Sequence, residues 1–190
     1  MKNTTSESYD SNIVAWLKLA ELEDIRAGRE WYFDGQAIVR AISAETELSP
    51  AIVAAVVACL SPGVDWLHNV ADAHAFCRAW AGGRNTEPSA CGYPANRTQA
   101  WRILEQGDPS LLTGPKRVAF AANLLGELEH VTVDRWAIRA ATGFARDRVA
   151  GPAQYKVVTD AYSRVAHANG FAPAVLQAII WVTIKRITER

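Results

Sequence analysis

The stretch that decides the fold runs from Leu111 to Gly143 and reads LLTGPKRVAFAANLLGELEHVTVDRWAIRAATG. A short turn at Gly114 leads into a helix that is expected to begin at Pro115 and to end at Gly126, because proline favours the first helical position and glycine the position after the last. A second helix follows the sequence Val-Thr-Val-Asp, which places Asp134 in its first turn. The stretch therefore predicts two helices, each introduced by a turn that carries polar groups.

Helical periodicity continues on both sides of this stretch. The run AIVAAVVACL at residues 51–60 follows Ser49-Pro50, a favourable helix start, and is apolar on every side, which predicts a helix at the centre of the core. Pro152 and Pro173 are expected to open the last two helices. No segment alternates apolar and polar residues as a strand would. The expected fold is all-α, a single helical domain over residues 1–190 with about eight to ten helices.

Composition limits the class of protein. The chain has 190 residues, of which 49% are hydrophobic and 21% charged, as in soluble globular proteins. No apolar run reaches the ~20 residues of a membrane span, and the polar start has no signal-peptide pattern. The three cysteines and four histidines show no metal-ligand spacing. We therefore expect a cytoplasmic monomer (in a host cytoplasm if the chain is viral) without membrane contact, metal or cofactor.

Charge is distributed unevenly along the sequence. Residues 1–80 hold 6 Lys and Arg against 11 Asp and Glu, whereas residues 81–190 hold 14 against 9. A basic half can bind phosphates even though the whole chain is neutral. The alternative is chance asymmetry on a solvated surface.

The turn at Gly114 has a chemical use as well. A glycine turn before a helix start presents backbone N–H groups, and the partial positive charge of the helix N-terminus suits a phosphate oxygen. Lys116 and Arg117 at the same end would add charge for that ligand.

The same segment resembles the core of the helix-hairpin-helix DNA glycosylase superfamily, of which endonuclease III is a member. Val133-Asp134, followed by Arg139, matches the family's Val-Asp-x-x-x-x-Arg motif, and Lys116 precedes Asp134 by 18 residues, as in the lyase-competent members. Upstream, residues 60–63 (LSPG) resemble the family's Leu-Ser-x-Gln segment, and residues 92–93 (GY) its Gly-Tyr stretch. The resemblance covers roughly residues 50–145, with the hairpin at 111–126.

The sequence departs from the family at three places. The hairpin keeps only one of its two usual glycines, and Gly63 stands where a DNA-probing glutamine is common. No cysteine follows Gly143, which excludes the family's iron–sulfur motif. These departures suggest a remote branch, in the style of phage-encoded members.

The resemblance implies a DNA glycosylase that cleaves the bond between a damaged or modified base and its sugar. Asp134 would stabilise positive charge on the deoxyribose, and Lys116 could form a Schiff base. The flipped base needs a pocket lined with aromatic side chains. The implied DNA contacts are Gly114, Lys116, Arg117, Arg135 and Arg139, and the implied pocket residues are Trp66, Trp136 and Asn69.

Each residue also has a plainer interpretation. Asp134 would stabilise a helix start, and Lys116 would contact a phosphate or solvent. Arg139 is as well suited to an ion pair with a neighbouring helix as to a phosphate contact. Asn69 would be a polar residue at a helix surface or in packing, and the two tryptophans would be partly buried in the core. For the whole chain, the alternatives are a transferase of the same fold that modifies a pyrimidine in DNA, a non-catalytic DNA-binding module, and a helical interaction protein.

Overall fold

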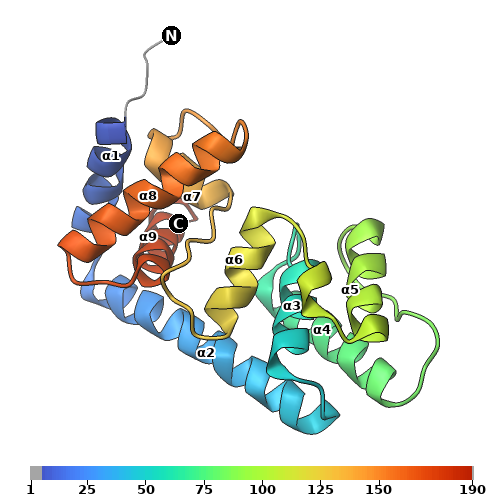
Figure 1. Ribbon diagram of the computed structural model, residues 1–190. Helices are drawn as coiled ribbons and strands as arrows, with labels where there is room; N and C mark the ends of the chain where they lie inside the picture. The colour runs from blue at the N-terminus through green and yellow to red at the C-terminus, as the bar shows by residue number, and fades with distance from the viewer. Residues whose placement is uncertain (1–5, 190) are drawn as a thin grey trace. The chain divides into compact units, whose positions relative to one another are not determined.

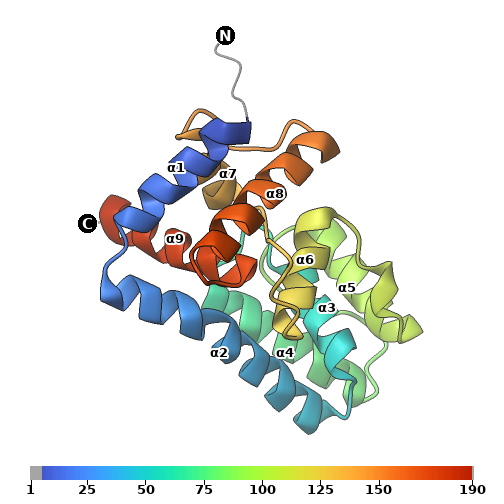
Figure 2. The same ribbon diagram turned by 60° about the vertical axis from the view of Figure 1, so that its left-hand side comes forward.

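Helices account for most of the backbone in the computed structural model, which describes residues 6–189 (Figures 1 and 2). Over these residues the chain forms nine α-helices and one short 3-10 helix and no strand, so the all-α prediction is confirmed. The elements are α1 (Ser6–Lys18), α2 (Leu22–Thr46), α3 (Pro50–Leu60), α4 (Trp66–Ala81), α5 (Pro94–Gln106), η1 (Pro109–Leu111), α6 (Pro115–Leu124), α7 (Arg135–Thr142), α8 (Pro152–Ala168) and α9 (Pro173–Thr188).

Contacts divide these helices into two compact units. Unit 1 comprises Met1–Phe33 and Glu127–Arg190, and unit 2 comprises Asp34–Gly126. Helix α2 supplies its first part to unit 1 and its second part to unit 2. The expectation of a single domain over residues 1–190 stays a prediction.

Unit 1 is built around an apolar cluster that α1, α7, α8 and α9 share. Helix α1 packs against each of the other three, and α8 and α7 both pack against α9. Pro152 and Pro173 open α8 and α9, as the sequence predicts. The largest fully buried side chains of the cluster are Ile13, Ile138, Tyr162, Leu176, Ile180 and Ile184.

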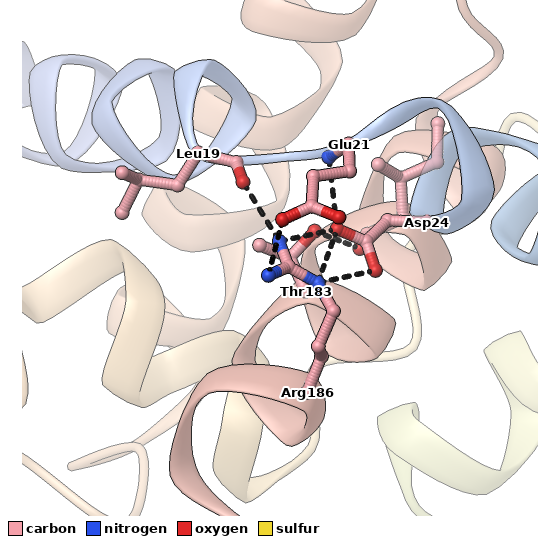
Figure 3. A network of polar contacts seen from close by, with 6 residues as sticks. Leu19, Glu21, Asp24, Thr183 and Arg186 are labelled. Atoms are coloured by element: carbon pink, nitrogen blue, oxygen red, sulfur yellow. Dashed lines mark hydrogen bonds and ion pairs between the residues drawn. The ribbon is translucent and has the colours of Figure 1, made fainter. Parts of the chain in front are cut away.

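A polar network fastens the start of α2 to the end of α9 within unit 1 (Figure 3). Arg186 Nη2 donates to Asp24 Oδ2 at 2.7 Å and to the carbonyl of Leu19 at 2.9 Å, while Arg186 Nη1 pairs with Glu21 Oε1 at 2.8 Å. The Asp24 side chain is only 3% exposed. Burial alone would raise the pKa of this carboxyl, but the hydrogen bonds and charge of Arg186 hold it below its ordinary value.

Close contact between α2 and α9 also depends on Gly28. A Cβ at this position would lie 2.5 Å from Ile179 Cγ1 and 2.6 Å from Ile179 Cα and N, so α9's backbone would have to move. A Cβ on Gly35, on the same helix but in unit 2, would lie 2.7 Å from the end of the Leu124 side chain and at an ordinary contact distance of 3.9 Å from the Trp66 ring.

We therefore expect Gly28→Ala to destabilise the protein by about 1–3 kcal/mol through overpacking, a cost that exceeds the gain in helix propensity. Gly35→Ala is the matched control, because a flexible side chain can turn away, and it should be neutral or slightly stabilising. Urea denaturation of both variants tests this expectation. Equal stabilities for the two variants would contradict it.

Unit 2 is organised around α3, whose residues Val53–Leu60 are all buried, as the apolar run predicts. Helices α4, α5 and α6 and the short η1 pack against it. Ser49 begins α3 by accepting a hydrogen bond from the N–H of Ile52 at 3.3 Å. The segments at residues 60–63, 92–93 and 111–126, which carry the family resemblance, all belong to this unit.

By length and composition, no single helix among residues 6–189 qualifies as a membrane span, although two sharply bent pairs, α2 with α3 and α8 with α9, pass the same test together.

Candidate functional site

Asp134 lies at the N-cap of α7, one position before the helix begins. The sequence placed it in the first turn; the extended backbone of this residue (φ −91°, ψ −172°) instead keeps it just outside. Its Oδ1 accepts a hydrogen bond from the N–H of Ala137 at 2.8 Å. The carboxylate is therefore held in one orientation, with the positive end of the helix dipole beside it.

Two tyrosines of α8 fix the backbone on either side of Asp134. The Tyr155 hydroxyl donates to the carbonyl of Val131 at 3.0 Å and accepts from the N–H of Val133 at 3.4 Å. The Tyr162 hydroxyl donates to the carbonyl of Ala137 at 3.4 Å. Burial first, and then the nearby charge of Asp134, raise the pKa of both phenols. Both groups therefore remain neutral hydrogen-bond donors around a half-buried carboxylate.

Trp136 and Arg139 form one surface on α7. The guanidinium carbon of Arg139 lies 4.8 Å from the centre of the Trp136 ring, and its Nε donates to Asp147 Oδ1 at 2.6 Å. Trp136 is half-buried and packs against the core of unit 1. Arg139 thus forms an ion pair, although its partner lies in the loop after α7 and not on the neighbouring helix that the sequence suggested. A role for Trp136 in a base pocket stays a prediction.

The predicted hairpin lies in unit 2, where η1 and a turn at Gly114 lead into α6. Gly114 has φ 92° and ψ 126°, a conformation that other residues rarely adopt, and Pro115 follows as the first helical residue. Lys116 is half-buried and makes no hydrogen bond or ion pair with any described residue. Helix α6 thus begins at Pro115 after a turn at Gly114, as the sequence predicts, and a phosphate contact there stays a prediction.

Arg117 turns inward and joins the hairpin to α3 and α5. Its Nη1 donates to Gln99 Oε1 at 2.8 Å and to Asn96 Oδ1 at 3.2 Å, and its Nη2 donates to Thr113 Oγ1 at 3.3 Å. The Cys59 thiol lies beside it and donates to the carbonyl of Asn96 at 3.2 Å. Burial raises the pKa of this thiol to about 11, although Arg117 acts in the opposite direction. Arg117 thus stabilises the hairpin from within the unit.

We expect Arg117→Met to destabilise the protein by about 1–3 kcal/mol, because Gln99 and Asn96 would lose a charged donor. Arg102→Met, which changes an exposed arginine of α5, is the matched control and should be neutral. Thermal unfolding followed by circular dichroism compares the two. Equal melting temperatures would show that the Arg117 contacts contribute nothing.

The two upstream segments that carry the resemblance meet in unit 2. A Cβ on Gly63 would lie 3.3 Å from the Tyr93 ring, and one on Gly92 would lie 3.0 Å from Val64. The Tyr93 side chain is 61% exposed, and an exposed ring offers a surface on which a nucleobase can stack. Sequence reasoning noted the Gly-Tyr pair without giving Tyr93 a role, because exposure of a ring beside a turn cannot be read from a pattern.

The remaining predicted pocket residues also lie in unit 2. Trp66 begins α4 and packs edge-on against Phe120, with ring centres 6.2 Å apart. Asn69, one turn later, is 1% exposed, and its amide has no hydrogen-bond partner among the described residues. A buried amide without a partner is costly, and a role for Asn69 in a base pocket stays a prediction.

Asp134, Trp136, Arg135 and Arg139 therefore belong to unit 1, and Gly114, Lys116, Arg117, Trp66 and Asn69 belong to unit 2. Within residues 6–189, no group of three or more His, Cys, Asp or Glu side chains is placed to hold a metal ion.

Fold and site define an all-helical protein with a capping carboxylate in one unit and a glycine-turn helix start in the other. The chain belongs to the Family of unknown function (DUF7178), whose model matches residues 1–188. No curated protein matches the chain, and no solved structure does. The likeness to helix-hairpin-helix glycosylases therefore rests on the sequence motifs alone.

Proposed function

We propose that the chain is a DNA-acting enzyme of the glycosylase type, which cleaves the N-glycosidic bond of a damaged or modified base with Asp134 as its central carboxylate. One observation carries the proposal. The half-buried Asp134 carboxylate at the N-cap of α7 is oriented by the N–H of Ala137, and the Tyr155 hydroxyl holds the segment just before it through hydrogen bonds to Val131 and Val133. A plain helix cap needs only the first of these contacts.

The chemistry requires such a carboxylate. Positive charge develops on the deoxyribose as the bond between C1′ and the base nitrogen breaks, and the bonding electrons leave with the base, which takes up a proton. A water oxygen bonds to C1′ and gives a proton to Asp134 or to solvent, so the products are a free base and an abasic sugar. A fixed negative charge beside C1′ lowers the energy of this transition state.

Unit 2 supplies some of the groups proposed to hold DNA. The backbone N–H groups at the start of α6 suit a phosphate, and Lys116 stands at the second helical position with its amine unpaired among the described residues. Arg117 acts indirectly in this proposal, because its guanidinium is engaged by Gln99 and Asn96. A Schiff base on Lys116 is an additional prediction, which borohydride trapping on abasic DNA would detect.

A non-catalytic DNA-binding module is the second candidate. It is favoured by the hydrogen bond from Ala137, because N-capping alone is a sufficient structural reason for an aspartate at position 134. This candidate predicts that DNA binding is unchanged or stronger in Asp134→Asn and that no product forms.

The decisive experiment incubates the purified protein with duplexes that carry a panel of damaged and hypermodified bases and measures free bases and nucleosides by mass spectrometry. Release of a free base by the wild type and not by Asp134→Asn supports the glycosylase. A gain of mass on a pyrimidine, without an abasic site, would replace it with the base-modifying transferase. Binding without any chemical change would support the non-catalytic module.

A further inference from the structure

Several arginines lie close to the Asp147 carboxylate, at the end of α7 and in the loop before α8. Arg139 Nε donates to Asp147 Oδ1 at 2.6 Å, and Arg146 and Arg148 are the chain neighbours of Asp147. Arg135 lies one helical turn before Arg139, so both side chains share a face of α7. We call Arg135, Arg139, Arg146 and Arg148 the arginine cluster.

Positive charge exceeds negative charge in this cluster. Asp147 compensates one guanidinium, while Arg135, Arg146 and Arg148 are exposed and form no ion pair with any described residue. The hydrogen bond from Arg139, followed by the charges of Arg139, Arg135 and Arg148, holds the pKa of Asp147 below its ordinary value. Repulsion among the guanidinium groups would fall if an anion bound between them.

The loop that carries the cluster is anchored, although its residues are exposed. The N–H of Phe144 donates to the carbonyl of Arg139 at 2.7 Å, and the N–H of Arg146 donates to Thr142 Oγ1 at 3.2 Å. The Phe144 ring lies 5.6 Å from that of Trp16, and Phe144 adopts a positive φ of 63°. Because the loop is already ordered, binding would not have to order it.

We propose that the arginine cluster binds the phosphate backbone of DNA, with Arg135, Arg146 and Arg148 as the contacting residues and the Arg139–Asp147 pair as the group that positions them. Planar guanidinium groups donate two parallel hydrogen bonds to phosphate oxygens, which a single lysine cannot do. The Phe144 ring, 41% exposed, adds an aromatic face beside the charges. The choice of DNA as the polyanion rests on the proposed function.

Equilibrium binding to a fluorescein-labelled DNA duplex, measured at several salt concentrations, tests the proposal. The slope of log K against log salt is about −0.9 for each phosphate that a protein neutralises. The variant R135Q/R146Q/R148Q should therefore have a slope shallower by about 2 to 3 and bind at least about tenfold more weakly at low salt. R135K/R146K/R148K should keep the slope and lose part of the affinity.

R26Q/R29Q/R102Q, which removes the same charge from exposed positions elsewhere, is the matched control and should retain a slope close to that of the wild type. Melting temperatures of all variants confirm that they are folded. An equal slope for the cluster variant and this control, or no DNA binding by the wild type at low salt, would overturn the proposal. Because binding needs no turnover, the two proposals can fail separately. DNA binding that depends on the arginine cluster, without base release, would support this inference and reject the glycosylase. Base release together with an unchanged salt slope in the cluster variant would support the glycosylase and reject this inference.

Discussion

Asp134→Asn is expected to reduce base release about 10³-fold while leaving the helix that it caps intact. Asparagine caps a helix as well as aspartate does, so the hydrogen bond from Ala137 should survive. The substitution removes the negative charge that stabilises the sugar in the transition state, and losses of about 10²–10³-fold are typical when one such group is removed. Single-turnover rates on the substrate found in the mass-spectrometric panel measure the effect.

Two further variants separate charge from structure. Asp134→Ala should lose activity and also about 1 kcal/mol of stability, because the cap is gone. Asp160→Asn makes the same carboxyl-to-amide change at an exposed ion pair on α8 and should leave base release unchanged. If Asp134→Asn released base at the wild-type rate, Asp134 would be a structural residue only.

Asp24→Asn is expected to have the largest effect on stability, a loss on the order of 3 kcal/mol. The substitution removes the charge that a nearly buried carboxylate supplies to Arg186, and breaking one side of a buried pair usually costs more than the pair contributes. Glu30→Gln is the control on the same helix, because its pair with Arg26 is exposed at both ends. Urea denaturation at neutral pH should show the loss for Asp24→Asn and almost none for the control.

The same carboxylate predicts how stability depends on pH. Because the pKa of Asp24 is lowered in the folded protein, its contribution is fully present above the unfolded value near 3.8 and disappears as the pH falls through the lower folded value. The difference in unfolding free energy between wild type and Asp24→Asn should therefore be constant from about pH 7 to pH 5 and shrink below about pH 4. A difference that stays constant down to pH 2 would contradict the assigned ionisation.

Local patterns predicted much of the helical fold. Apolar runs, prolines and glycines placed α3, α6, α8 and α9 correctly, since these signals act within a few residues of each other. Helix α2 holds two glycines, Gly28 and Gly35, which lower the helix propensity of its sequence. The reason for a glycine at position 28 is the close approach of Ile179 on α9, about 150 residues away in sequence, which no local pattern can show.

The sequence indicated which residues to consider for the candidate site, but it did not predict their conformations or contacts. A motif located Asp134, but its N-cap conformation and the contacts of Tyr155 depend on how α8 packs. Arg117 was expected to contact DNA because of its charge at a helix start, and Arg139 because of the family motif, with an ion pair as the equal alternative. The structure gives both of them protein partners, Gln99 and Asp147. Charge can be counted in a sequence, but the direction of a long side chain is decided by the tertiary neighbours that it meets.

Unit 1 is formed by the two ends of the chain, so its parts are synthesised at different times. Residues 34–126 leave the ribosome as one continuous stretch and contain all of unit 2. Helix α1 emerges roughly a hundred residues before the helices α7, α8 and α9 against which it packs. In the interval its apolar face has no partner from its own unit, so a nascent chain that stalls after residue 126 would expose that face to chaperones and proteases while unit 2 is already complete.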